Sequence, residues 1–212
     1  MKIAKNLRPK NLYNKTIFIE MEMKDFFSYQ NYGKYFIKSF DFDPENSYHS
    51  IPLYLIWAEK CMFLKKVINN NYFNTKCFYW IDSGWFRESK EMSKFVNNWP
   101  SPKICYNDDR VLINLVRKFS DEEIIDIRNF NLPALKNLQK RINVAGGMFG
   151  GRPEKLIKFI DLYYKSIDEY VQHNLFIGKD QNLFTYISFS HPDIVKLTFS
   201  KGNYFFLKKY LS

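Results

Sequence analysis

The sequence predicts a single α/β domain, residues 1–212, with a mixed, mostly parallel central sheet flanked by helices. Its length of 212 residues is enough to bury a substantial core without disulfides. Short apolar runs typical of strands alternate with apolar residues at helical spacing, the order found in βαβ units. The chain contains no internal repeat and no low-complexity linker that would indicate a second domain.

The first half of the chain predicts a strand, a helix and a second strand. The segment 15–21, "KTIFIEM", is rich in β-branched and aromatic residues, as strands are. A helix is expected from Ser50, the N-cap, with Pro52 in its first turn, to the asparagines at 69–71. Its expected core face carries apolar residues at helical spacing: Leu53, Ile56, Trp57, Leu64, Val67 and Ile68. The apolar run at 77–82, "CFYWID", predicts the next strand.

The second half continues the alternation. Residues 110–119 fit a strand or a helix, and their Val-Leu-Ile run and their neighbours favour a strand. Residues 120–130 are interpreted as a short helix capped by Ser120. "NVAGGMFGG" (143–151) has a strand-like centre with two pairs of glycines, and a long amphipathic helix follows from Pro153. A glycine-led turn at 178 leads into a last helix with Asp180 as its N-cap, and the tail contains two short strand-like pieces.

The composition bounds the class of protein. Hydrophobic residues make up 46% and aromatic residues 19% of the chain, which excludes a disordered protein. The net charge of +10 would suit a polyanionic partner. However, Lys, Asn, Ile, Phe and Tyr are all abundant and share AT-rich codons, so base composition explains much of this charge. Because the chain has no recognisable nucleic-acid motif, nucleic acid is the least favoured partner.

The N-terminus and the cysteines indicate the compartment. The first 15 residues are charged where a signal peptide needs an apolar segment, and no apolar run approaches the about 20 residues of a membrane span. We therefore expect a cytoplasmic protein without a transmembrane segment. Cys61, Cys77 and Cys105 are an odd number without a CxxC pair, which argues against a disulfide scaffold and a zinc site. All three thiols are predicted to be reduced.

One segment that can carry chemistry is "WIDSGWFR" (80–87). Asp82 lies at the end of an apolar strand, where α/β proteins bind ligands. It can bind a divalent metal ion or a ribose, Gly84 lets the backbone approach a ligand, and Arg87 can neutralise a phosphate. The alternative is an ordinary turn with a solvated aspartate.

Two later segments also have both a functional and a purely structural interpretation. In "AGGMFGG" the paired glycines, Gly146 and Gly147 first, permit close approach to a ligand, or else form two tight turns around a buried Met-Phe pair. In "GKDQ" the Asp180 carboxylate can contact substrate hydroxyls, and Gln181 offers a donor and an acceptor. The alternative is that Asp180 only caps a helix.

Taken together, these pieces resemble the HtrL/YibB family of glycosyltransferase-like proteins. The matching pieces are Trp57-Ala58-Glu59-Lys60, "NNNYFNTKCFYWIDSGWFR", "GGMFGG" and "GKDQ", in the family's order over about residues 50–187. The layout is also similar to glycogenin-type transferases, which have the GT-A fold. The resemblance therefore implies a single GT-A-like, that is Rossmann-like, domain over residues 1–212.

The resemblance also implies roles for individual residues. Asp82 takes the place of a D-x-D aspartate that holds a divalent metal ion, Mn²⁺ or Mg²⁺, and His191 is the candidate for a further ligand. Gly146 and Gly147 line the sugar, and Asp180 and Gln181 act on it in catalysis. The other implied donor-binding residues are Lys60, Gly84, Arg87 and Lys179.

Two departures stand against this pattern. The triplet Asp82-Ser83-Gly84 carries one carboxylate where the glycogenin type has two, and the sequence around His191, "SFSHPD", does not match. The family's first strand, similar to "FFDIGR", which holds the nucleotide base in a GT-A fold, has no counterpart before "NKTIFIEM".

The expected function is transfer of a hexose from a nucleotide-diphosphate sugar, a UDP-sugar first of all, to a saccharide or protein acceptor. The alternative is a non-catalytic carbohydrate- or nucleotide-binding remnant of the same fold. We expect Asp82, Gly146 and Asp180 to converge on one cleft, because each follows or ends a predicted strand, and the transferase function has its main support in this convergence.

Overall fold

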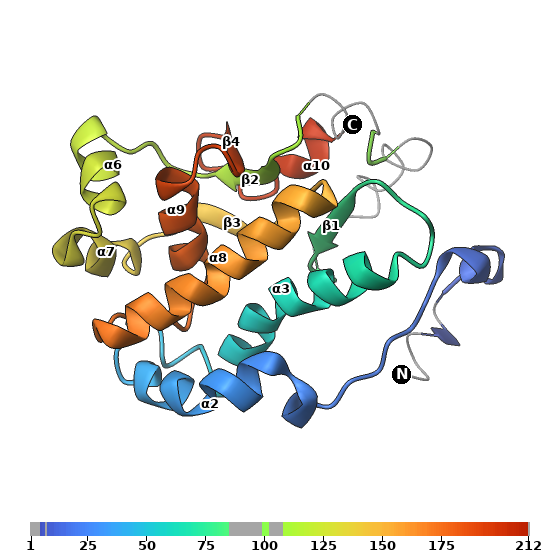
Figure 1. Ribbon diagram of the computed structural model, residues 1–212, viewed down its shortest axis with the longest axis horizontal. Helices are drawn as coiled ribbons and strands as arrows, with labels where there is room; N and C mark the ends of the chain where they lie inside the picture. Colours follow the sequence, from blue (N-terminus) through green and yellow to red (C-terminus); the bar gives the residue numbers. More distant parts are fainter. Residues whose placement is uncertain (1–4, 7, 85–98, 102–107, 212) are drawn as a thin grey trace.

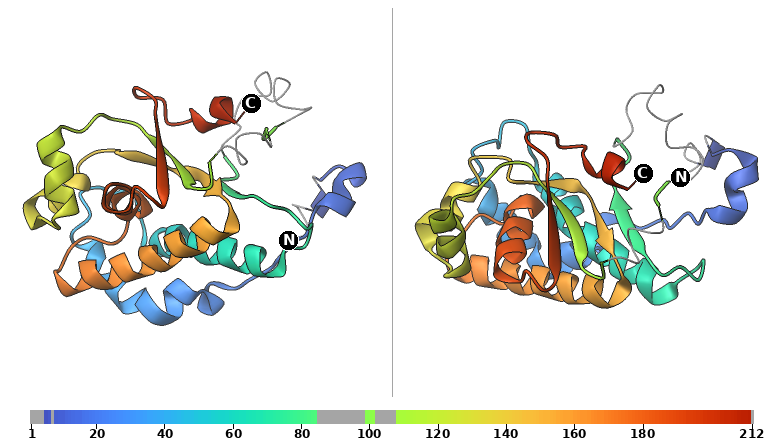
Figure 2. Two further views of the ribbon diagram at one scale, coloured as in Figure 1. Left: turned by 45° about the horizontal axis from the view of Figure 1, so that its top comes forward. Right: turned by 90° about the horizontal axis from the view of Figure 1, so that it is seen from above.

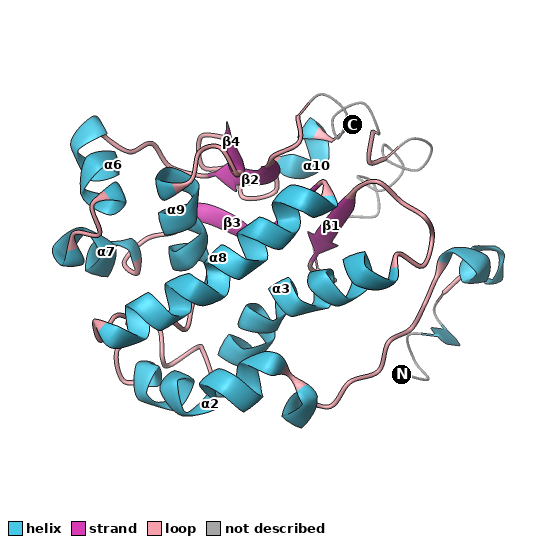
Figure 3. Ribbon diagram, in the orientation of Figure 1, coloured by secondary structure: helices cyan, strands magenta, loops and turns pink. Residues whose placement is uncertain are grey.

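The computed structural model describes residues 5–6, 8–84, 99–101 and 108–211, and within them a central sheet is flanked by helices (Figure 1). The sheet has four strands in the order β1-β3-β2-β4. The strands are β1 (Phe78–Ile81), β2 (Val111–Leu115), β3 (Val144–Gly151) and β4 (Val195–Phe199). The α/β class predicted from the sequence is therefore confirmed (Figure 3).

The expectation of a mostly parallel sheet is wrong. β3 pairs antiparallel with β1 on one side and with β2 on the other, and the β2–β4 pair alone is parallel. The other three strands all run in one direction, and β3 lies between two of them in the opposite direction. A pattern of apolar runs predicts the strands but not the order in which they pair, so the reversed strand could not be foreseen.

Helices α3 (Ile51–Asn70), α8 (Pro153–Gln172) and α9 (Asp180–Ser190) pack on one face of the sheet (Figure 2). α2 (Phe27–Phe40) packs against α3, and α6 (Asp121–Arg128) and α7 (Leu132–Leu138) pack beside α9. On the other face of the sheet, Leu112 and Met148 pack against α10 (Leu207–Tyr210). Strand residues alternate between the two faces, so that Ile113 and Phe149 join the main core.

The ends of three predicted helices are confirmed. Ser50 has the extended backbone of an N-cap before α3, and Asn71 ends the helix in the left-handed conformation at φ 38°. Ser120 and Glu123 form a reciprocal capping box at the start of α6. α8 begins at Pro153 and turns its apolar stripe, including Phe159 and Tyr163, into the core.

Several local predictions are wrong. Residues 16–22 form no strand: they follow a 3-10 helix, η1 (Lys10–Lys15), and precede another, η2 (Met23–Asp25), while the side chains of Ile17 and Ile19 are exposed. The second strand-like piece of the tail forms the helix α10. The apolar pattern of such short segments fits a strand and a helix equally well, and tertiary contacts decide between them. The helices α2 and α7 were not predicted.

The cysteine prediction is wrong at one position. Cys77, directly before β1, is disulfide-bonded, whereas Cys61 is a free, buried thiol in α3, and Cys105 lies outside the described residues. Spacing along the chain does not show which cysteines meet in space, and proximity is what a disulfide needs. Because disulfides persist mainly in oxidising compartments, this bond does not favour the cytoplasmic location expected from the sequence.

Gly150 has the closest backbone neighbours in the middle of the sheet. A Cβ atom at this position would lie 2.3 Å from the Phe78 carbonyl oxygen and 2.6 Å from the Tyr79 Cα. Both are backbone atoms of the adjacent strand β1 and cannot turn away as a side chain would. β1 can therefore lie this close to β3 only because residue 150 is glycine.

We expect Gly150→Ala to lower the free energy of unfolding by about 3 kcal/mol, because the strands must separate to admit the methyl group. Gly33→Ala, in helix α2, is the matched control, since a Cβ there meets nothing within 4 Å. The control should raise the free energy of unfolding by about 0.5–1 kcal/mol. Equilibrium urea unfolding checks both values, and equal effects would contradict the close approach of β1 and β3.

Candidate functional site

The Lys60 ammonium lies at the point where four elements meet. Its Nζ is 2.9 Å from Asp180 Oδ2, 3.1 Å from the Gly146 carbonyl oxygen and 3.4 Å from Asp82 Oδ1. The lysine comes from α3, Asp180 from the start of α9, Gly146 from β3 and Asp82 from the end of β1. The prediction that Asp82, Gly146 and Asp180 lie together is thus confirmed, with Lys60 as the group on which they converge. Of the three, however, only Asp82 lines the cleft described below.

Because Lys60 and Asp180 are buried, the ionisation of each depends on the charge of the other. The Lys60 and Asp180 side chains are 4% and 5% exposed. Burial by itself lowers the pKa of Lys60, but attraction to Asp180 and Asp82 outweighs it, so the net pKa is raised and the ammonium stays protonated. Burial raises the pKa of Asp180, and the neighbouring Lys60 opposes this rise. The lysine is therefore the group that allows a carboxylate to be ionised inside the core.

Two glycines bring Asp180 to this place. A Cβ at Gly146 would lie 2.9 Å from both carboxylate oxygens of Asp180, so only glycine lets β3 and α9 approach. A Cβ at Gly178 would lie 2.6 Å from the ring of Phe176 and 2.9 Å from Tyr54. Lys179, rather than Asp180, is the N-cap residue of α9. The prediction that Asp180 caps the helix is therefore wrong: Asp180 is the first helical residue, and its side chain turns to Lys60.

Unlike Asp180, Asp82 is held in place by a backbone hydrogen bond to β3 and by Trp80. Its backbone N–H donates to the Gly147 carbonyl at 2.8 Å, which continues the β1–β3 ladder by one residue. Trp80 Nε1 donates to Asp82 Oδ1 at 2.7 Å. The two side chains lie on one face of the strand because they are two residues apart. The Asp82 side chain is 39% exposed, so it is the carboxylate of this group that solvent and ligands can reach.

An open cleft of about 900 Å³ lies over this group. α3 and the end of β1 form one part of its wall, and residues before β3 and before α10 form the other. Aromatic and aliphatic side chains predominate around Lys60 and Asp82. The lining residues are Ile56, Trp57, Lys60, Trp80, Ile81, Asp82, Ser83, Gly84, Ile142, Tyr204 and Phe205.

The other residues predicted for the site are scattered. Gln181 lies next to the cleft, where its Nε2 donates to the Tyr204 hydroxyl at 3.1 Å. Lys179 forms an ion pair with Glu45 instead of facing the cleft. His191 follows the last residue of α9, about 16 Å along the helix from Asp180, so it cannot share a metal ion with Asp82. Arg87 lies outside the described residues.

The described residues of the cleft do not form a metal site of the two-carboxylate kind. Asp82 is the only carboxylate among the described residues that line it, and Lys60 fills the space between Asp82 and Asp180. Elsewhere, the loop between α2 and α3 brings potential ligand atoms of Asp43, Glu45 and His49 within 4.8 Å of one another. These groups already have partners, since Asp43 accepts from His49 and Tyr54 while Glu45 pairs with Lys179.

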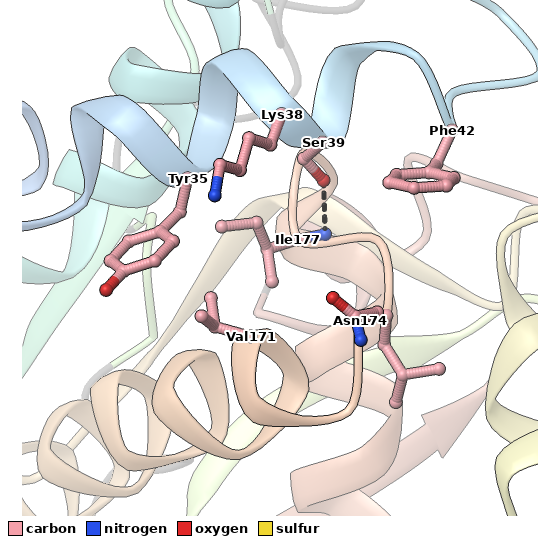
Figure 4. A pocket seen from close by; sticks show the side chains of 8 residues that line it. Tyr35, Lys38, Ser39, Phe42, Val171, Asn174 and Ile177 are labelled. Atoms are coloured by element: carbon pink, nitrogen blue, oxygen red, sulfur yellow. Dashed lines mark hydrogen bonds between the residues drawn. The ribbon is translucent and has the colours of Figure 1, made fainter.

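A second cavity, of about 110 Å³, lies between the ends of α2 and α8 (Figure 4). Tyr35, Val171 and Ile177 line it, and the Ile177 N–H donates to Ser39 Oγ at 2.9 Å. This hydrogen bond ties the segment before α9 to α2, and so helps to place Lys179 and Asp180. The cavity is small, and we assign it a structural role.

A family model described as "bacterial protein of unknown function (HtrL_YibB)" matches residues 3–211. The chain belongs to the HtrL/YibB family. No curated protein and no solved structure matches it. None of the described helices of this HtrL/YibB chain is long and apolar enough to cross a membrane.

The motifs found in the sequence therefore contain the charged floor of the cleft and two of its aromatic residues, Trp57 and Trp80, but not Tyr204 and Phe205. Trp57 and Ile56 were expected in the core, yet both line the cleft, and Ile56 is 40% exposed. Trp57 lies three residues before Lys60 on α3 and hence on the same face, a spacing that could have identified it. Tyr204 and Phe205 gave no such signal, because the tail reaches the cleft only in the folded chain.

We expect Lys60→Met to lower the free energy of unfolding by about 3–5 kcal/mol, because it leaves the buried Asp180 carboxylate without a partner. Adding Asp180→Asn should recover part of this loss. Lys65→Met on the same helix is the control: it removes an exposed pair with Asp161 and should cost less than about 1 kcal/mol. A double-mutant cycle by urea unfolding measures the coupling, and strictly additive effects would contradict a Lys60–Asp180 pair.

Proposed function

We propose that this chain is a glycosyltransferase that binds the sugar of a nucleotide-diphosphate donor, a UDP-hexose first of all, in the cleft over Lys60. The observation that carries the proposal is the combination of Trp57, Trp80 and Phe205 around an accessible carboxylate, Asp82. Aromatic rings pack against the apolar faces of sugar rings, and a carboxylate accepts hydrogen bonds from sugar hydroxyls. This combination suits a saccharide better than a purely apolar ligand.

The size and position of the cleft support a small-molecule ligand. Its volume of about 900 Å³ falls within the range of about 300–1,000 Å³ typical of ligand sites. It lies beyond the carboxyl end of β1, the edge at which open α/β sheets bind ligands. The family resemblance, to proteins similar to glycogenin-type transferases, suggests the same edge for the donor.

In this proposal each polar residue has one task. Asp82 accepts hydrogen bonds from the sugar, and Lys60 fixes the orientation of the Asp82 carboxylate. Asp180 holds Lys60, and Gln181 orients the Tyr204 hydroxyl at the wall of the cleft. A carboxylate beside the reacting carbon favours an oxocarbenium-like transition state, so Asp82 takes over the role that the sequence had suggested for Asp180.

A second candidate function is saccharide binding without catalysis. The observation that favours it is the burial of Asp180, whose side chain faces Lys60 and does not line the cleft. Among the described residues this leaves a single carboxylate to act on the sugar. The two candidates share the binding step and differ only in whether the bond to the leaving nucleotide is broken.

Binding and turnover separate the two candidates. A thermal-shift panel of UDP-, GDP- and CMP-sugars and of free saccharides identifies the ligand, since a ligand at 100 times its Kd stabilises by about 2.7 kcal/mol. A donor-hydrolysis assay on the best ligand then tests for chemistry. Release of nucleotide supports the transferase, binding without release supports the second candidate, and a panel without any shift contradicts both.

We expect Trp57→Ala and Asp82→Asn each to weaken sugar binding about tenfold or more, because each removes one of the two kinds of contact that a sugar needs. Tyr48→Ala is the control, as the Tyr48 side chain is 87% exposed and lies outside the cleft. Isothermal titration with the ligand found in the panel measures the three affinities. If Trp57→Ala and Tyr48→Ala bind equally well, the sugar does not lie in this cleft.

A further inference from the structure

The environment of Lys60 resembles that of a bound cation. Three oxygen atoms surround its Nζ at 2.9–3.4 Å: a carboxylate oxygen from α9, a carboxylate oxygen from β1 and a backbone carbonyl oxygen from β3. Carboxylate and carbonyl oxygens are the ligands that hard divalent cations prefer. The chain places an ammonium group among them instead.

We infer that Lys60 is the built-in cation of this cleft, and that Asp82 and Asp180 hold the ammonium group rather than a divalent metal ion. The inference deepens the proposed function, because it concerns how the same cleft receives a donor. It departs from the pattern of the glycogenin-type transferases, in which two aspartates hold Mn²⁺.

The geometry leaves little room for a metal ion beside the lysine. The Asp180 carboxylate faces Lys60 on one side and lies against the backbone of Gly146 on the other, at a distance that would not admit even a Cβ atom. Asp82 Oδ1 already accepts from Trp80 Nε1 and lies near Lys60 Nζ. A divalent ion that binds about six oxygens would therefore meet only one carboxylate, that of Asp82, among the described residues that line the cleft.

The charges agree with the geometry. The protonated Lys60 already compensates one of the two carboxylate charges, and a divalent ion within a few ångströms of it would be repelled in this weakly solvated place. Removal of the ammonium group would turn this repulsion of a divalent ion into attraction, because two carboxylates and a carbonyl oxygen would then surround an empty position. Such a position has the ligands of a Mn²⁺ or Ca²⁺ site.

The test measures Mn²⁺ binding to the purified full chain without any sugar, by isothermal titration and by the EPR signal of free Mn²⁺. We expect wild-type protein to show no Mn²⁺ binding that depends on Asp82. Lys60→Ala should bind Mn²⁺ at least about tenfold more tightly than wild type, at one site per chain, since a repelling charge is gone. Adding Asp82→Asn or Asp180→Asn to Lys60→Ala should abolish that site.

Two controls separate this site from other effects. Lys65→Ala removes a lysine from the exposed face of the same helix and should leave Mn²⁺ binding unchanged. Glu45→Gln removes one candidate ligand of the Asp43, Glu45 and His49 group, so binding that Glu45→Gln abolishes belongs to that group. A folded Lys60→Ala protein without any new Mn²⁺ site would overturn the inference.

The wild-type protein provides a test even if Lys60→Ala does not fold. Stoichiometric Mn²⁺ binding that Asp82→Asn abolishes in the otherwise native chain would overturn the inference directly. No such binding, together with an affinity for the ligand of the thermal-shift panel that EDTA does not change, supports it. Because Mn²⁺ binding is measured without sugar, its outcome is independent of whether the chain transfers or only binds a saccharide.

Discussion

The ion pair between Lys60 and Asp180 is the contact on which the described structure around the cleft depends. It joins the helices α3 and α9 directly, and through Gly146 and Asp82 it includes the strands β3 and β1. A buried charge without a partner is strongly unfavourable. If one of these elements moved away, the buried charge that remained would lose its partner. One interaction thereby fixes the relative position of four elements that are far apart in the sequence.

This constraint explains why small residues gather around the pair. Gly146 admits the Asp180 carboxylate, and Gly178, two residues before Asp180, admits the rings of Phe176 and Tyr54. A buried ion pair contributes little net stability compared with apolar packing of the same volume, but it permits few alternative arrangements. We interpret the pair as an interaction that holds the surrounding elements in one arrangement. A cleft with one accessible carboxylate requires such a fixed arrangement.

The cleft also shows how far a family resemblance can be carried to individual residues. Asp82, which the resemblance compared with a D-x-D aspartate, lies beside the ammonium group of Lys60, a residue of the Trp57-Ala58-Glu59-Lys60 motif. Asp180 and Gln181 of the "GKDQ" motif support the floor and a wall of the cleft rather than projecting into it. The motifs meet at one cleft, and the side-chain geometry separates the residues that line it from those that lie beneath it.

The sequence by itself determined the α/β class, helices α3, α6, α8 and α9, strands β1 to β4, and the charged residues of the cleft floor, because apolar periodicity, caps and glycine pairs are local signals. The tertiary structure decided the rest. The reversed direction of β3, the unpaired segment 16–22, the disulfide at Cys77 and the aromatic wall from Tyr204 and Phe205 all depend on contacts between distant segments. Lys60 shows the difference most clearly: its charge is a property of the sequence, but its partners exist only because folding buries it where three oxygen atoms converge.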